Sequence, residues 1–199
     1  IGLLDRSNVS VLDENSNKDA AIVSTQRDLI AGEVSKDIAR RKLIPTDILE
    51  AHDSGAIHFH DMDYIIQPMF NCCLINLEDM LTNGTVINGK KIDTPKSFQV
   101  ACTVTTQIIA QVASGQYGGQ SINGIDRILA PFVRKSYEKI LNNVIEEQVE
   151  IYGMEPNMEK AREIAWKRTR KEVKDGIQTI QYQINTLMTT NGQSPFVTL

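Results

Sequence analysis

The chain has 199 residues, of which 41% are hydrophobic and 23% charged, so it can bury a core as one large domain or as a piece of a larger one. Its formal net charge is −4 at pH 7, and its only strongly basic stretch is residues 166–174, which argues against general binding to nucleic acid. No window reaches about 18 uninterrupted apolar residues and no signal-peptide pattern is found, so we expect no membrane span and a cytoplasmic protein.

Two helices are predicted in the first part of the chain. Residues 17–43 have apolar side chains at helical spacing, and basic residues near the end suit the helix dipole. The apolar positions are Ile22, Leu29, Ile30, Val34 and Ile38. Residues 46–55 follow Pro45 and end at Gly55, a natural C-terminal stop for a second helix.

Three segments are predicted as strands. Residues 56–60, AIHFH, alternate apolar and imidazole side chains, and residues 69–77, MFNCCLINL, are rich in β-branched and aromatic side chains. Residues 194–199, SPFVTL, form the third. Between them, residues 82–95 contain Asn-Gly twice, which predicts a turn or a small hairpin.

Three longer helices are predicted over residues 97–116, 126–153 and 157–192, with a break at 117–125. The first has almost no charge, which suits a helix buried on most sides. The last is longer than an ordinary globular helix, which suggests helix pairing or a contact between subunits. We find no repeat and no linker, so we expect one domain.

The motif HFHDMD, residues 58–63, could be a set of metal ligands, because His-x-His on a strand places two imidazoles on one face. Only His52 remains elsewhere in the sequence, so a zinc hydrolase would lack its later histidines. We therefore favour a strand end at which Asp61 and Asp63 orient the imidazoles by hydrogen bonds, without a metal. Contact with a substrate is the alternative.

The sequence contains three cysteines, an odd number, which predicts reduced thiols rather than a disulfide framework. Cys72 and Cys73 are neighbours in a predicted strand, so they face opposite sides and at most one thiol can reach a cleft. A disulfide between them would be strained. By composition alone, free cysteines are small hydrophobic residues of a core, which is also our interpretation of Cys102.

The glycine-rich stretch GQYGGQS, residues 115–121, matches neither the dinucleotide fingerprint nor the P-loop. It is weak evidence for phosphate binding. A helix C-cap followed by a tight reversal explains it better.

Five blocks of the sequence, taken in order, resemble the anaerobic ribonucleoside-triphosphate reductases, the class III or glycyl-radical family. The resemblance extends from about residue 15 to the last residue, and five ordered blocks are far more specific than any one of them. The blocks are residues 24–41, 55–64, 70–81, 94–122 and 189–198.

The resemblance implies an α/β fold, in which this mostly helical chain with a few strands is the first part of a ten-stranded α/β barrel that encloses the active site. Residues 1–199 would then be a single partial domain. The family's ATP cone, the cysteine that becomes a thiyl radical, the glycyl radical and a four-cysteine zinc site are expected outside these residues. We therefore do not expect the chain to turn over substrate alone.

The family's chemistry, carried over by resemblance, removes the 2′-hydroxyl of a ribonucleoside triphosphate after a thiyl radical takes the 3′-hydrogen. Formate is the reductant, and a radical-SAM enzyme activates the protein. The reaction needs a second thiol on the first barrel strand, under the ribose, to supply a hydrogen atom. The resemblance implies that this thiol is Cys72, because NCCLI aligns best through its first cysteine with the Ser-Cys-Val-Leu-Ile pattern of the aerobic reductases.

Two further residues are implied as substrate contacts. Asn71 matches the serine of that pattern and is a candidate for ribose contact, although strict alternation turns it away from Cys72 unless both lie at a strand end. His58 is a weaker candidate at the rim of the substrate site. Cys73 would face the barrel wall as part of the core.

The family also binds an effector, ATP or a deoxynucleoside triphosphate, at a homodimer interface where helices of two subunits pack together. The three long predicted helices fit this arrangement. By chemical character, Gln107 is implied for the base, Lys139 for the phosphates and Asp93 for the ribose. A lysine on an amphipathic helix is also commonly just solvated.

Two alternatives stay open. The chain could belong to another glycyl-radical enzyme, such as a formate-lyase relative, but those enzymes place adjacent cysteines on a finger loop rather than on a strand. It could also be a non-catalytic module that senses nucleotides or dimerises.

Overall fold

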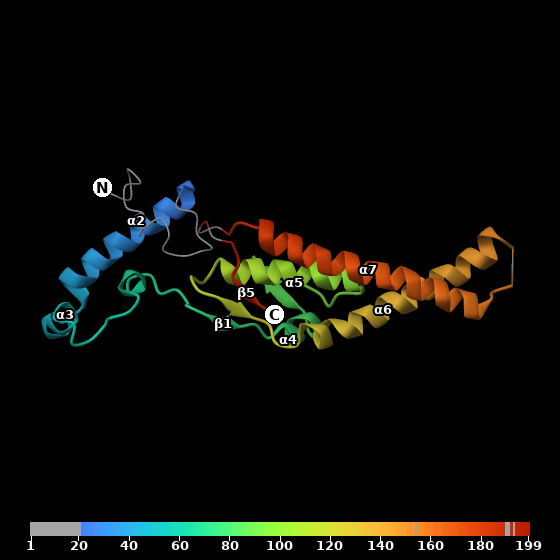
Figure 1. Cartoon of the computed structure of the whole chain (residues 1–199), viewed down its shortest axis with the longest axis horizontal. Coiled ribbons are helices and arrows are strands. Elements are labelled where there is room, and N and C mark those ends of the chain that lie inside the picture. The colour runs from blue at the N-terminus through green and yellow to red at the C-terminus, as the bar shows by residue number, and fades with distance from the viewer. Residues whose placement is uncertain (1–20, 154, 190–191, 193) are drawn as a thin grey trace. The chain divides into compact units, whose positions relative to one another are not determined.

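The computed structural model describes residues 21–153, 155–189, 192 and 194–199, and the chain forms two compact units (Figure 1). The first unit contains the described residues up to Cys72, together with Ser114–Gly118 and the described part of Met188–Ser194. The second contains Cys73–Ala113, Gly119–Leu187 and Pro195–Leu199.

The first unit is built around the helix α2, Val23–Ile38, which continues as a single π-helical turn over Ala39–Leu43. A short helix α3, Thr46–Asp53, follows, and Gly55 ends it with a positive φ of 78°, as predicted. The 3₁₀ turn η2, Met62–Tyr64, packs against α2. A small apolar core of Ala39, Ile44 and Met62 joins these elements.

The predicted apolar face of the first helix is wrong. Ile30, Val34 and Ile38 are 41%, 52% and 41% exposed, whereas Thr25 and Ser35 are buried. The hydroxyl of Thr25 donates to the carbonyl of Gly192 at 2.9 Å, and η2 approaches α2 closely at Gly32, where a Cβ would lie 3.4 Å from the Cβ of Asp63. Residues 17–20 of the predicted helix lie outside the described residues.

The strand predicted at residues 56–60 is also wrong. After Gly55 the chain follows an irregular path, and the backbone N–H of Phe59 donates a hydrogen bond to Nδ1 of His52 at 3.2 Å rather than to a neighbouring strand. Asp61 then adopts the left-handed region, with φ 53°, which turns the chain into η2. Alternating side chains without a partner strand do not make a strand.

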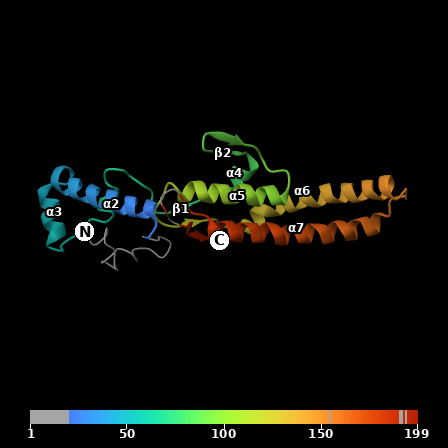
Figure 2. The same ribbon diagram turned by 90° about the horizontal axis from the view of Figure 1, so that it is seen from above.

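Three long helices dominate the second unit, as predicted: α5, Phe98–Ala113, α6, Ile125–Glu146, and α7, Met158–Thr186. The last one ends earlier than predicted, because the backbone becomes extended at Leu187. The end of α6 continues as a π-helical turn over Glu147–Ile151. All three helices pack against one another, and Figure 2 shows them running side by side. Nine side chains of α5 are buried, which explains why this helix carries no charge.

The start of α5 is capped by side chains from the other two helices. The backbone N–H of Phe98 donates to Oγ of Ser136 on α6 at 2.8 Å, and that of Gln99 donates to the carboxylate of Glu172 on α7 at 3.1 Å. The Ser136 hydroxyl in turn donates to the same carboxylate at 2.9 Å. Because the first amides of a helix have no partner within it, this network fixes the helix start in the core.

A small parallel sheet has the order β1–β4–β5, with strands Cys73–Leu74, Gln120–Ser121 and Val197–Thr198. Cys73 pairs with Gln120, and Gln120 pairs with Val197. The strands predicted at 69–77 and 194–199 are therefore present but much shorter, and β4 was not predicted. The strand predicted at 69–77 is cut short because helix α4, Leu77–Thr82, begins there. Asn76 caps this helix by accepting a hydrogen bond from the backbone N–H of Asp79.

The hairpin predicted at residues 82–95 is confirmed. Strands β2, Thr85–Ile87, and β3, Lys90–Ile92, pair antiparallel. Asn88 and Gly89 have φ values of 49° and 72°, the two positive values that a tight hairpin turn requires. In Figure 2 the hairpin stands beside α5 and α4. Among the helices that the structure describes, none is long and apolar enough to cross a membrane.

Candidate functional site

The two adjacent cysteines differ in environment. Cys72 is exposed and precedes β1, and its thiol donates a hydrogen bond to Oδ1 of Asn71 at 3.2 Å. Cys73 begins β1, is half-buried and packs against the apolar core of the second unit. Asn71 and Cys72 can contact each other because they lie before the strand, where alternation does not apply.

The glycine-rich stretch pairs with the segment that carries Cys72. A parallel bridge joins Phe70 to Gln116, and the backbone N–H groups of Tyr117 and Gly118 donate to the carbonyls of Phe70 and Asn71 at 3.1 and 2.8 Å. Glycine is required at 118 because a Cβ there would lie 2.4 Å from the Asn71 carbonyl oxygen. This stretch therefore supports the segment beside Cys72.

Tyr117 is a feature of this site that the sequence did not reveal. Its hydroxyl donates to Oδ2 of Asp61, and its ring stacks on Tyr64 with centroids 4.2 Å apart and planes 8° from parallel. Burial, the hydrogen bond to Asp61, and the nearby charges of Asp61, Asp63 and Cys72 raise the pKa of Tyr117 to about 12. The phenol therefore stays protonated at neutral pH.

The histidines of the HFHDMD motif form a hydrogen-bonded turn. Nε2 of His60 lies 3.3 Å from Oδ1 of Asp61, and Nδ1 of His60 lies 3.4 Å from Nε2 of His58. An aspartate does orient an imidazole here, as the favoured interpretation expected, but on a turn rather than on a strand. Within the described ranges, no group of three or more His, Cys, Asp or Glu side chains could hold a metal ion.

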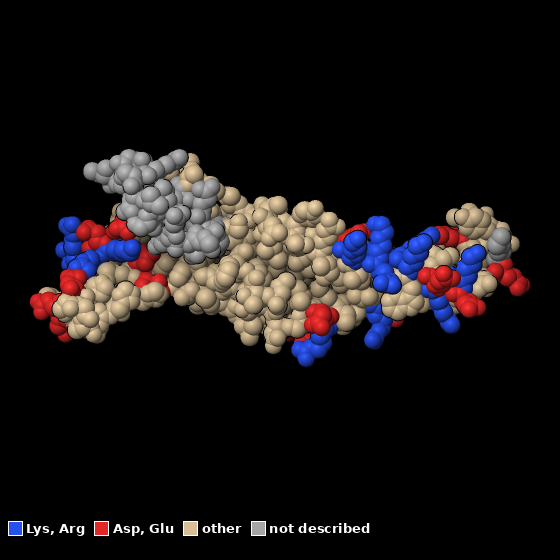
Figure 3. Space-filling view, in the orientation of Figure 1, with Lys and Arg blue, Asp and Glu red and all other residues tan. Residues whose placement is uncertain are grey.

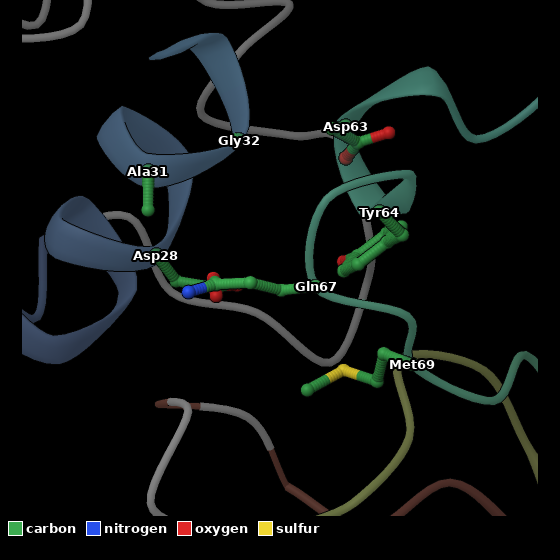
Figure 4. Close-up of a pocket in the computed structure, with 7 residues that line it drawn as sticks. All are labelled: Asp28, Ala31, Gly32, Asp63, Tyr64, Gln67 and Met69. Carbon is green, nitrogen blue, oxygen red and sulfur yellow. The ribbon is translucent and has the colours of Figure 1, made fainter. Parts of the chain in front are cut away.

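A small polar pocket of about 70 Å³ lies in the first unit, between α2, η2 and the segment that follows η2 (Figure 4). It has room for about two water molecules. Its walls combine two carboxylates, an amide, a phenol ring and a thioether. The residues that line it are Asp28, Ala31, Gly32, Asp63, Tyr64, Gln67 and Met69. The pocket was not predicted, because its residues come from segments far apart in the sequence.

The three residues implied for the effector all lie in the second unit. Gln107 is on α5, Lys139 is on α6, and Asp93 lies between β3 and α5. Each side chain is exposed. The structure, over the residues it describes, shows no hydrogen bond or ion pair between any two of them.

Comparison with known proteins bears on these observations. Residues 14–199 match the family model described as "Anaerobic ribonucleoside-triphosphate reductase". The chain belongs to this family. Among anaerobic ribonucleoside-triphosphate reductases, that of Escherichia coli is 49% identical over 198 residues, covering 99% of this chain and 26% of the relative. That of enterobacteria phage T4 is 43% identical over 199 residues, covering 100% of this chain and 31% of the relative.

The fold of the chain is also similar to that of a family member of known structure. The anaerobic ribonucleotide reductase from Thermotoga maritima aligns with a TM-score of 0.56 and 13% identity, over 98% of this chain and 30% of that one. The resemblance found in the sequence is thus confirmed. The chain spans 26% to 31% of the length of the Escherichia coli and phage T4 reductases, so it corresponds to part of such a protein.

Proposed function

We propose that the chain is the N-terminal part of the catalytic barrel of an anaerobic ribonucleoside-triphosphate reductase, a single partial domain of a ten-stranded α/β barrel. The whole protein would reduce ribonucleoside triphosphates to deoxyribonucleoside triphosphates. The observation that carries this proposal is the exposed thiol of Cys72, held beside Asn71 at the start of β1 in a chain that matches the reductases over almost its whole length.

The role proposed for Cys72 is hydrogen-atom donation. A thiol can give its hydrogen atom to a carbon radical of the ribose, because the sulfur can then hold the unpaired electron. The S–H bond breaks as a C–H bond forms, and formate would be the final reductant. The glycyl radical, the radical-SAM activating enzyme and a zinc site would act through parts of the protein outside residues 1–199.

Asn71 and His58 are proposed as substrate contacts. The Oδ1 of Asn71 already accepts from the Cys72 thiol, which leaves its amide N–H groups available to a ribose hydroxyl. His58 is exposed, as a residue at the rim of a substrate site would be. It remains the less favoured of the two.

The second unit is proposed to bind the effector at a homodimer interface. Large apolar side chains are exposed on its helices, among them Val100 on α5 and Ile177 and Tyr182 on α7, at 48%, 49% and 61%. In Figure 3, charged side chains gather at the C-terminal end of α6 and the N-terminal end of α7, whereas the surface over α5 carries few charged side chains. Gln107, Lys139 and Asp93 are the effector contacts proposed.

Calorimetry tests this proposal against a non-catalytic module and against other glycyl-radical enzymes. The full-length protein should bind dATP, dGTP, dTTP or ATP as a dimer, and it should convert ribonucleoside triphosphates in the presence of formate after activation. Binding of nucleotide without conversion would favour the sensing module. A folded dimer that binds no nucleotide would contradict the proposal. The position of Cys73 in a parallel sheet, rather than on a finger loop, supports the reductase over a formate-lyase relative.

A further inference from the structure

A row of titratable side chains in the first unit leads from the neighbourhood of Cys72 to the solvent. The Tyr117 hydroxyl donates to Oδ2 of Asp61, and the other carboxylate oxygen, Oδ1, lies 3.3 Å from Nε2 of His60. The second ring nitrogen of His60, Nδ1, lies 3.4 Å from Nε2 of His58. Asp61 and His60 each use two different atoms to contact their two neighbours, so the row is continuous.

We propose that Tyr117, Asp61, His60 and His58 form a proton relay between solvent and the surroundings of the Cys72 thiol. The inference rests on the proposed function, because it gives the relay a reaction to serve. Tyr117, Asp61 and His60 are positioning residues in this sense, since none of them is shown to touch a substrate.

Solvent exposure decreases along the relay from the two histidines to Asp61 and Tyr117, as expected for a path that takes up protons from water at its histidine end. His58 is exposed and the His60 side chain is 72% exposed, so both can exchange protons with water. The Asp61 side chain is 31% exposed and Tyr117 is half-buried.

The inner end of the relay is attached to the segment of Cys72. The backbone of Tyr117 donates to the carbonyl of Phe70, and a Cβ on Gly118 would lie 2.9 Å from Sγ of Cys72. The backbone of Tyr117 is thus fixed to the segment that carries Cys72.

The transfers balance without any electron or additional reagent. His60 takes a proton at Nδ1 from His58 or water and releases its Nε2 proton to Oδ1 of Asp61. The carboxyl turns about its Cβ–Cγ bond and gives this proton to the phenol oxygen of Tyr117, while the phenol hydroxyl turns away from Asp61 and gives its own proton to the 2′-hydroxyl that leaves the ribose. At each step one bond to hydrogen breaks and one forms. Loss of the substrate's 2′-hydroxyl as water consumes one proton, which this relay would supply.

Other charged and titratable groups lie around the relay and contribute to its electrostatic environment. On α3, the ring of His52 lies 5.7 Å from that of His58, and Asp53 is paired with Arg40 at 2.6 Å. Asp63 follows from η2, and Asp28 faces the same region from α2. His52 accepts from the backbone N–H of Phe59 and lies outside the row, which makes it a matched control.

The existence of the relay can be tested without activity, by ¹⁹F NMR of the full-length protein with 3-fluorotyrosine at position 117. Its signal should show a step between about pH 5 and 8, where an imidazole titrates. The step should vanish in His60→Ala and in Asp61→Asn and should persist in His52→Ala. A signal that is flat across this range in the parent protein, or a step that survives both relay variants, would overturn the proposal.

Turnover then tests the use of the relay. In active enzyme, His60→Ala should lower kcat roughly 10²-fold, within the range of proton-transfer effects, with little change in KM, and imidazole in the buffer should restore part of it. A purely structural role would not respond to imidazole. His60→Ala with the parent's kcat and pH profile would overturn the proposed use. Lack of turnover in the activated parent protein would instead count against the proposed function, and the ¹⁹F titration would still decide whether the relay exists.

Discussion

Replacing Gly118 with alanine crowds the side-chain and carbonyl oxygens of Asn71 and the thiol of Cys72. The new Cβ would lie 2.4 Å from the carbonyl oxygen of Asn71 and 2.9 Å from Sγ of Cys72. The first distance is roughly 1 Å shorter than an unstrained carbon–oxygen contact. The oxygen cannot simply move away, because it accepts the hydrogen bond of the Gly118 N–H at 2.8 Å. The two segments must therefore separate.

The cost follows from these contacts. Overpacking costs about 1–3 kcal/mol, and weakening the two backbone hydrogen bonds, from Tyr117 and Gly118, adds about 1 kcal/mol each. Alanine also restricts the unfolded chain, which returns about 0.4–1 kcal/mol. We expect Gly118→Ala to lower the free energy of unfolding by about 2–5 kcal/mol. Gly118 is not among the glycines with positive φ, so the clash alone is responsible.

Urea denaturation of the full-length protein measures this cost, and the rate at which iodoacetamide alkylates Cys72 reports the local displacement. Gly55→Ala is the control, because Gly55 has φ 78° and nothing within 4 Å of its Cβ position. Gly55→Ala should lower the free energy of unfolding only by about 1–2 kcal/mol, the cost of placing a Cβ in the left-handed conformation, and it should leave the alkylation rate of Cys72 unchanged. A Gly118→Ala protein as stable as its parent, with the same rate at Cys72, would refute the reasoning.

Three further predictions concern the core and the thiols. Glu172→Ala removes the acceptor of the Gln99 N–H and of the Ser136 hydroxyl. Its free energy of unfolding, measured by urea denaturation, should fall by about 1–3 kcal/mol for each unpaired donor. Glu172→Gln keeps an oxygen there and should lose less; equal losses would contradict the capping network. Burial, with a smaller effect from the charge of Glu172, raises the pKa of Cys102 from 9.0 to about 12. The folded state therefore favours the protonated thiol, and its contribution to stability is present below pH 9 and lost as the pH rises to about 12. Thermal melts should show this alkaline loss in the parent protein and a smaller one in Cys102→Ala. Finally, peptide mass spectrometry should find exposed Cys72 alkylated before buried Cys102, and similar rates at the two would conflict with the described burial.

Local sequence rules predicted the elements whose stability is local. The hairpin follows from Asn88-Gly89, which accept the two positive φ values of the turn. Helix α5 follows from a long run without charge that is suited to burial. Two of its capping groups could not be predicted, because Ser136 and Glu172 come from two other helices.

The wrong and missed predictions have a common physical cause: the local sequence pattern does not show which distant segment a residue pairs with. Residues 56–60 alternate as a strand does, but none of the strands in the described part of the chain lies beside them, and His52 accepts the hydrogen bond of the Phe59 N–H instead. Strand β4 has only two residues and exists because Gln120 pairs with strands on both sides. The family resemblance singled out Cys72, but it gave no sign of Tyr117, whose partner Asp61 lies 56 positions away.

The most direct test of the account compares two adjacent cysteines in the full-length, activated protein. Cys72→Ala should abolish formation of deoxyribonucleotide while nucleotide affinity, measured by calorimetry, stays near that of the parent. Cys73→Ala should retain activity and cost about 1 kcal/mol of stability, because Cys73 packs against the core. Product formation by Cys72→Ala at the rate of the parent protein would contradict the central claim that this thiol donates hydrogen to the substrate.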